Sequence, residues 1–120
     1  TKKGRKCRFD LWEPKDFGLH TAETFENAVA KYGRENIKRA YTYKALNRLI
    51  QGSSADQTKQ AMLSCYQAGY LPILQLHDEL CFNVNPKDVK DIKKIMENCI
   101  EFKLPFVVDV NIGASWGEAK

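Results

Sequence analysis

The spacing of apolar residues changes partway along this chain, and that change limits its fold more than any other feature. Over residues 54–66 apolar side chains recur every three or four positions, which is typical of a helix with one buried face. Over residues 74–84 every second residue is apolar except Asp78, which is typical of strands. The pattern therefore predicts a helix followed by a β-hairpin whose turn is formed by Asp78 and Glu79.

Other elements are predicted from the same patterns and from their boundary residues. Helices are expected over residues 21–32, 36–50 and 86–100, and short strands over residues 7–11 and 106–112. Thr21 is the expected N-cap of the first helix, and Gly33 is expected to end it. We expect residues 51–54, Gln-Gly-Ser-Ser, to interrupt the helical structure, with a serine capping the next helix.

These elements predict an α+β fold in which helices pack against one face of an antiparallel sheet. The sequence has no internal repeat and no low-complexity linker, so residues 1–120 are expected to form one unit. Hydrophobic residues make up 43% of the chain, which is enough apolar material for a core and argues against wholesale disorder.

The composition also limits the compartment in which the chain works. No apolar run approaches the ~20 residues that span a bilayer, and the basic start of the chain is no secretory signal. The cysteines are far apart, without the spacing of a zinc site or a disulfide framework: Cys7, Cys65, Cys81 and Cys99. We therefore expect no membrane partner and a reducing compartment.

Charge is unevenly distributed along the sequence. Residues 1–50 carry twelve Lys and Arg against six Asp and Glu, whereas residues 51–120 carry seven against nine. This asymmetry suits a protein that holds a polyanion on one part and a cation on another. The basic cluster within residues 2–8 has two interpretations, a solvated edge that discourages strand pairing or a contact with nucleic-acid phosphates.

The acidic pair at the predicted turn is chemically unusual. Asp78 and Glu79 are adjacent like charges, and the turn has neither the glycine nor the asparagine that tight hairpins favour. A divalent cation would make this arrangement favourable, because Mg²⁺ prefers one or two carboxylates together with substrate phosphates. The alternative is an exposed, solvated turn in which His77 is structural.

Four short stretches fit one known pattern. Residues 47–56 read Asn-x-x-x-Gln-Gly-Ser-Ser-Ala-Asp, and residues 76–80 read Leu-His-Asp-Glu-Leu. Residues 4–6 read Gly-Arg-Lys, and residues 113–118 read Gly-Ala-Ser-Trp-Gly-Glu. Together they resemble family A DNA polymerases, the relatives of bacterial DNA polymerase I, in the family's order. In that comparison residues 76–80 are similar to motif C, the His-Asp-Glu hairpin of the polymerase palm.

The resemblance implies a catalytic role for the hairpin. Asp78 is expected to be one of two carboxylates that hold two Mg²⁺ ions, about 3.5–4 Å apart, across the primer terminus and the incoming nucleotide. The second aspartate, from motif A, is outside this chain. Glu79 is expected to be an accessory metal-site carboxylate, and His77 to lie close to the primer-terminal nucleotide.

The resemblance also implies contacts with the duplex. Asn47 and Gln51 are expected to meet it near the insertion site, since amides suit the nearly sequence-blind acceptors of the minor groove. The alternative is that both amides bond at a helix end beside Gly52. Arg5 and Lys6 are expected to contact primer or template phosphates.

Two positions depart from the family pattern. Tyr43 stands where the family has an arginine, and it cannot supply a guanidinium fork. That contact is either lost or taken over by Lys44 or Arg48. Leu49 stands where the family has a proline. The two departures indicate a divergent, phage-like or organelle-like branch, so we expect the chain in the cytoplasm of a bacterium or phage-infected host, with an organelle matrix as the alternative.

The resemblance therefore implies part of a DNA-directed DNA polymerase, a nucleotidyltransferase of DNA replication. Its partners would be primer–template DNA, deoxynucleoside triphosphates and the remaining polymerase part, which carries motif A, the fingers and the thumb. Residues 1–120 would be the C-terminal part of the palm, and by themselves they are not expected to extend a primer. Two alternatives are a non-catalytic nucleic-acid-binding module that retains the palm fold and a purely structural domain.

Overall fold

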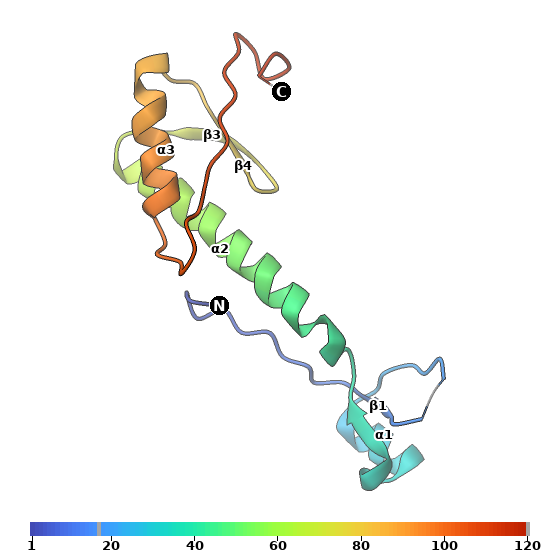
Figure 1. The fold of residues 1–120 in the computed structure, drawn as a ribbon. Coiled ribbons are helices and arrows are strands. Elements are labelled where there is room, and N and C mark those ends of the chain that lie inside the picture. Colours follow the sequence, from blue (N-terminus) through green and yellow to red (C-terminus); the bar gives the residue numbers. More distant parts are fainter. Residues whose placement is uncertain (17, 120) are drawn as a thin grey trace. The chain divides into compact units, whose positions relative to one another are not determined.

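The structure is a computed structural model that describes residues 1–16 and 18–119 of the chain (Figure 1). Its contacts divide the chain into two compact units, Thr1–Gly52 and Ser53–Lys120. Helices and small antiparallel sheets occur together, so the predicted α+β class is confirmed. The expectation of a single sheet is wrong within the described residues, because each unit contains its own two-stranded sheet.

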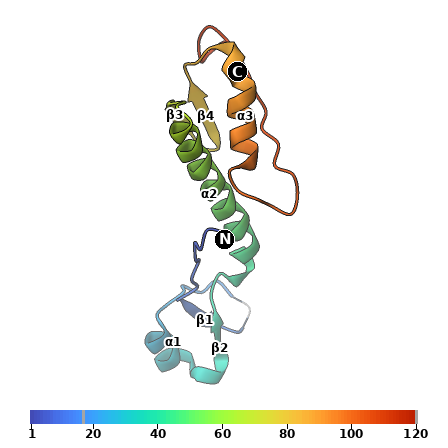
Figure 2. The same cartoon turned by 90° about the vertical axis from the view of Figure 1, so that its left-hand side faces the viewer.

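In the first unit a short sheet packs against one helix (Figure 2). Strand β1 (Trp12–Pro14) pairs antiparallel with β2 (Ile37–Arg39), and α1 (Phe25–Tyr32) contacts both strands. Two single-turn 3₁₀ helices, η1 (Arg34–Asn36) and η2 (Thr42–Lys44), flank β2. The buried hydrophobic side chains of this unit are small or β-branched: Ala28, Ile37 and Ala40.

The first helix is close to its prediction. Its N-cap is Thr24 and not Thr21, so the helix begins at Phe25. Gly33 ends it as predicted, because its φ of 79° is disfavoured for side chains with a Cβ and its N–H donates to the Val29 carbonyl.

Two predictions in the first unit are wrong. Residues 7–11 form no strand, since the pairing with β2 begins at Trp12. Residues 36–44 are not an α-helix, because Ile37–Arg39 pair with β1 and Tyr41 has a φ of 61°. Pairing with a distant strand overrides the helical spacing here.

Helix α2 (Ala45–Gln67) runs without a break through the predicted interruption at residues 51–54. Glycine inside a helix costs about 1 kcal/mol relative to alanine, so Gly52 needs another explanation. A Cβ at Gly52 would lie 3.2 Å from the Arg5 Cδ and 3.3 Å from the Thr1 Cγ2. Gly52 therefore permits the first residues to approach the helix, and it does not end the helix.

The second unit contains the predicted hairpin and a third helix. Strand β3 (Pro72–Leu76) pairs antiparallel with β4 (Glu79–Phe82), and the 3₁₀ turn η3 (Pro86–Asp88) leads into α3 (Val89–Asn98). The helix opens near Pro86 and Asp88 as predicted, and Asn85 Oδ1 accepts a hydrogen bond from the Lys87 N–H. The buried hydrophobic side chains belong to α2, α3 and the residues just after α3: Ala61, Cys65, Ile92 and Ile100.

A buried glutamine joins α2 to α3. Gln57 is 2% exposed, and its Nε2 donates to the Met96 carbonyl over 2.7 Å. Its Oε1 is buried without a hydrogen-bond partner among the described residues. Nearby, the Cys99 thiol donates to the Met96 carbonyl over 3.3 Å.

Residues 106–112 form no strand, so that prediction is wrong. They run as extended chain past α3, where the Val108 N–H donates to Glu97 Oε1 over 3.0 Å (Figure 1). Val107 is 69% exposed and Ile112 is 62% exposed. Among the helices that the structure describes, none is both long and apolar enough to cross a lipid bilayer.

Candidate functional site

The turn of the β3–β4 hairpin lies one residue earlier than predicted. Leu76 pairs with Glu79, so His77 and Asp78 form the two-residue turn and Glu79 is the first residue of β4. The prediction that Asp78 and Glu79 form the turn is therefore wrong by one position. The local contact that fixes the turn comes from Gln75, whose Nε2 donates to the His77 carbonyl over 3.0 Å.

His77 adopts a left-handed backbone conformation in this turn. Its φ is 52°, a region that disfavours side chains with a Cβ but in which histidine is enriched several-fold. Holding such a conformation costs on the order of 1–3 kcal/mol. The backbone at the hairpin apex is thus held by its surroundings and not by intrinsic preference.

The two carboxylates differ in their surroundings. Asp78 is an exposed turn residue, whereas Glu79 contacts the C-terminal segment. Glu79 Oε1 accepts hydrogen bonds from the Trp116 Nε1–H at 3.1 Å and from the Cys81 thiol at 3.5 Å. Partial burial and the hydrogen bond to Glu79 raise the pKa of Cys81 above its usual range, so the thiol stays protonated as a donor at neutral pH.

The hairpin apex fits part of a magnesium site. Asp78 and Glu79 place two hard oxygen donors next to each other in solvent, and Mg²⁺ in proteins commonly takes one or two carboxylates plus phosphates and water. Residues 1–16 and 18–119 contain no group of three His, Cys, Asp or Glu side chains that could hold a metal ion. The apex thus offers two carboxylates of the kind that Mg²⁺ takes.

The predicted duplex-contacting amides lie on α2. Asn47 and Gln51 are both exposed and are four residues apart, so they share one face of the helix. The alternative that they bond at a helix end beside Gly52 is wrong for this arrangement, because α2 continues to Gln67.

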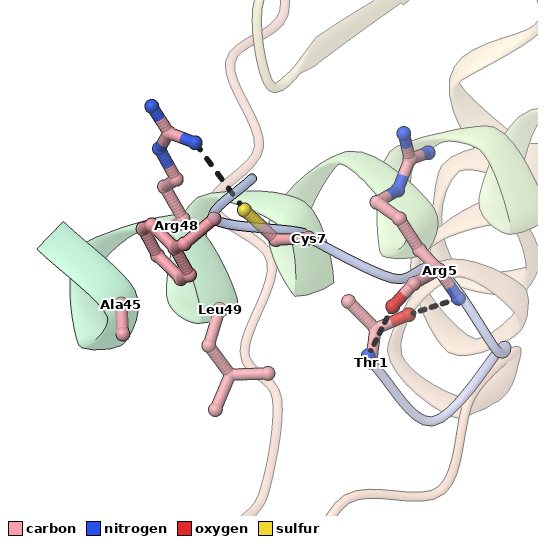
Figure 3. Close-up of a pocket in the computed structure, with 7 residues that line it drawn as sticks. Thr1, Arg5, Cys7, Ala45, Arg48 and Leu49 are labelled. Carbon is pink, nitrogen blue, oxygen red and sulfur yellow. Dashed lines mark hydrogen bonds between the residues drawn. The ribbon is translucent and has the colours of Figure 1, made fainter. Parts of the chain in front are cut away.

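Two basic residues of the first unit, Arg5 and Arg48, line a cavity of about 210 Å³ (Figure 3). Its lining residues come from the first segment and the start of α2: Thr1, Arg5, Cys7, Phe9, Ala45, Arg48 and Leu49. Arg48 Nη1 donates to the Cys7 sulfur over 3.4 Å, and its guanidinium lies 5.3 Å from the centre of the Phe9 ring. Two arginines thus border this cavity, while Lys6 is exposed beside it in sequence.

The position that departs from the family pattern carries a nearby cation. Tyr43 is 78% exposed, and the Lys44 ammonium lies 5.5 Å from the centre of its ring. The same ammonium lies 5.1 Å from the ring of Tyr41. These aromatic contacts hold a positive charge beside Tyr43.

The structure distributes the predicted site residues between the two units. The first unit contains Arg5, Lys6, Asn47 and Gln51, and the second contains His77, Asp78 and Glu79. The contact between Trp116 and Glu79 was not predicted from the sequence. The sequence holds no signal for it, because Trp116 is 45% exposed and an exposed indole N–H can donate to water.

The family model described as DNA polymerase family A matches residues 21–118. A DNA-directed DNA polymerase of Pseudomonas phage M6 is 44% identical over 120 residues, which cover 99% of this chain and 15% of the phage protein. DNA polymerase I of Streptococcus pneumoniae is 38% identical over 95 residues, which cover 71% of this chain and 11% of that protein.

A eukaryotic DNA polymerase is also similar to this chain. DNA polymerase theta of Drosophila melanogaster is 36% identical over 103 residues, which cover 72% of this chain and 5% of that protein. The chain thus spans about a seventh of the phage relative's length and less of the others. No solved structure matches it significantly.

Proposed function

We propose that this chain, which belongs to DNA polymerase family A, forms the C-terminal part of the palm of a DNA-directed DNA polymerase. The observation that carries the proposal is the β3–β4 hairpin, which presents Asp78 and Glu79 to solvent at its apex within the matched residues. On this proposal the hairpin takes part in template-directed addition of nucleotides to a primer 3′-hydroxyl.

Asp78 would act as a metal ligand and Glu79 as an accessory carboxylate of the same site. Asp78 suits the first role because it is exposed and acidic at the tip of the turn. Two bound Mg²⁺ ions would activate the primer hydroxyl as a nucleophile and stabilise the charge of the departing pyrophosphate. The second aspartate of this site would come from outside these 120 residues.

His77 would contact the primer-terminal nucleotide. Its left-handed backbone and the bond from Gln75 to its carbonyl fix the position of its Cα in the turn next to Asp78. A strained residue beside the reacting groups is typical of functional sites, which supports this role.

The first unit would hold the duplex. Asn47 and Gln51 expose amides one helical turn apart, which suits acceptors at the edges of neighbouring base pairs. Arg5 and Lys6 would neutralise backbone phosphates, and Lys44 would replace the arginine that the family has at the position of Tyr43.

The remaining polymerase part would cover apolar surface of the second unit. Several large apolar side chains of this unit are exposed, including Tyr66 on α2, Ile73 on β3 and Leu71 between these elements. Exposed apolar side chains that lie this close in sequence suit an interface. Primer–template DNA and deoxynucleoside triphosphates would bind to the assembled polymerase in the cytoplasm of a bacterium or a phage-infected host.

The test is single-turnover primer extension with Mg²⁺ by the complete polymerase that carries these residues. Asp78→Ala should lower nucleotide addition by more than about a hundredfold, because losing a metal ligand removes several kcal/mol of charge stabilisation. Asp109→Ala is the matched control, since it removes an exposed carboxylate outside the hairpin and should leave the rate unchanged. Full activity of Asp78→Ala would reject the catalytic role and favour the nucleic-acid-binding module.

A further inference from the structure

The last residues of the chain fold into a closed turn. The Glu118 and Ala119 N–H groups both donate to the Ser115 carbonyl over 3.1 Å, and the Ala114 N–H donates to Glu118 Oε2 over 3.2 Å. The turn depends on Gly113, where a Cβ would lie 2.7 Å from the Ala119 nitrogen and 2.8 Å from the Glu118 carbonyl carbon. Side chains are thus excluded at Gly113, whereas a Cβ at Gly117 would meet open space.

This turn carries Trp116 to the hairpin. The Trp116 indole donates to Glu79 Oε1 over 3.1 Å, and the Cys81 thiol reaches the same oxygen from two residues along β4. An exposed glutamate has several accessible rotamers, and two donors on one oxygen restrict them. Both donors are neutral, so they orient the carboxylate and leave its negative charge in place. A lysine or arginine donor would cancel that charge.

We infer that Trp116 is a positioning residue for the hairpin carboxylates: it holds Glu79 by Oε1, so that Oε2 and the Asp78 carboxylate are presented to the metal ions. The inference rests on the proposed function of the hairpin. It assigns a role to the closed C-terminal turn, which presents an indole N–H to a carboxylate 37 residues earlier in the chain. The substitutions Trp116→Phe and Gly113→Ala should therefore have the same effect, since one removes the donor and the other opens the turn that carries it.

The first test measures the contact between Trp116 and Glu79 independently of polymerase activity. The complete polymerase is labelled with ¹⁵N-tryptophan, and the Trp116 indole signal is identified by its absence from the Trp116→Phe spectrum. Glu79→Ala should move this signal upfield, because the indole N–H loses a charged acceptor. An unmoved signal in Glu79→Ala would overturn the inference, whatever the polymerase activity.

The second test measures whether Trp116 positions Glu79 for metal binding. Trp116→Phe and Gly113→Ala should each raise the Mg²⁺ concentration for half-maximal nucleotide addition by roughly tenfold, the lower end for groups that orient metal ligands. The dissociation constant for primer–template should not change, and Gly117→Ala is the matched control that leaves both values as they are. In a Glu79→Ala background Trp116→Phe should add no further effect.

The outcomes separate the two proposals. An unchanged Mg²⁺ midpoint in both Trp116→Phe and Gly113→Ala would reject the positioning role, even if the indole signal moved. Full activity of Asp78→Ala, with the indole signal still moved by Glu79→Ala, would reject the proposed catalytic function and leave the Trp116 contact standing. Because Gly113→Ala keeps the indole itself, it provides the test if Trp116→Phe does not fold.

Discussion

The hairpin and the segment over residues 106–112 have similar alternating sequences but different structures. In the hairpin, β3 and β4 are joined by a two-residue turn and pair antiparallel, with one register shift between Pro72 and Leu74. Residues 106–112 remain extended, and the Val108 N–H attaches them to α3 by a hydrogen bond to Glu97. The difference teaches that alternation predicts an extended chain, whereas a strand also requires a partner, and a nearby partner costs little loop-closure entropy.

The largest expected effect comes from breaking the ladder of the hairpin. Cys81→Pro should lower the free energy of local opening of residues 72–82 by roughly 2 kcal/mol or more, because proline removes a donor from the sheet and fixes φ. Amide hydrogen exchange should then show protection falling about thirtyfold in β3 and β4. Val110→Pro, placed in the unpaired segment, should change protection little; equal losses for both variants would contradict the comparison.

A smaller effect is expected where the 106–112 segment is tied to α3. Glu97→Ala should raise hydrogen exchange at Val108 by roughly fivefold, since the Val108 N–H loses its acceptor, worth about 1 kcal/mol. Exchange in the hairpin should not change. Lys93→Ala is the control, because it removes the 3.7 Å ion pair with Glu97 but leaves the acceptor in place.

Removing the backbone strain at His77 should stabilise the hairpin, which is the opposite of the effect expected from Cys81→Pro. His77→Gly should stabilise the hairpin by roughly 0.5–1 kcal/mol, because glycine adopts positive φ without a Cβ penalty. Hydrogen exchange of β3 and β4 should slow by a few-fold, while that of residues 106–112 stays the same. His77→Val should weaken the hairpin, and a stabilising effect of valine would show that the turn is unstrained.

The smallest effect is expected where α2 packs near α3, because the reactivity of Cys65 on α2 should not change when the hairpin is destabilised. Burial raises the pKa of Cys65 to about 11, with smaller contributions from Cys99 and Asp91. The neutral thiol therefore stabilises the fold below pH 9, and this contribution is lost as the pH rises through about 11. Below pH 9, alkylation by iodoacetamide should be slower at Cys65 than at the exposed Cys7, and Cys81→Pro should not accelerate the reaction of Cys65.

The sequence predicted elements whose determinants are local. Gly33 and Pro86 mark element boundaries that the structure confirms, because positive φ or a missing N–H acts at the residue itself. The hairpin was also predictable, although its turn was placed one residue late since neither candidate turn contains the usual glycine. Non-local features were missed, such as the pairing of Ile37–Arg39 with β1 and the continuation of α2 through Gly52.

The candidate site divides in the same way. Asp78 and Glu79 could be selected because adjacent like charges repel and because residues 76–80 resemble motif C. Their different surroundings could not be predicted, because the Trp116 contact spans 37 residues and depends on a steric closure at Gly113.

The amide of Gln57 has a further consequence for α2 and α3. A purely apolar contact between two helices tolerates sliding by a turn, about 5.4 Å, because one methyl group can replace another. A slip of one turn would break the hydrogen bond from Gln57 Nε2 to the Met96 carbonyl. The buried Nε2 would then lose its partner, as Oε1 of the same side chain already lacks one among the described residues. Gln57 thus fixes the position of α3 along the longer helix α2. It thereby also fixes the position of Glu97, to which Val108 is attached.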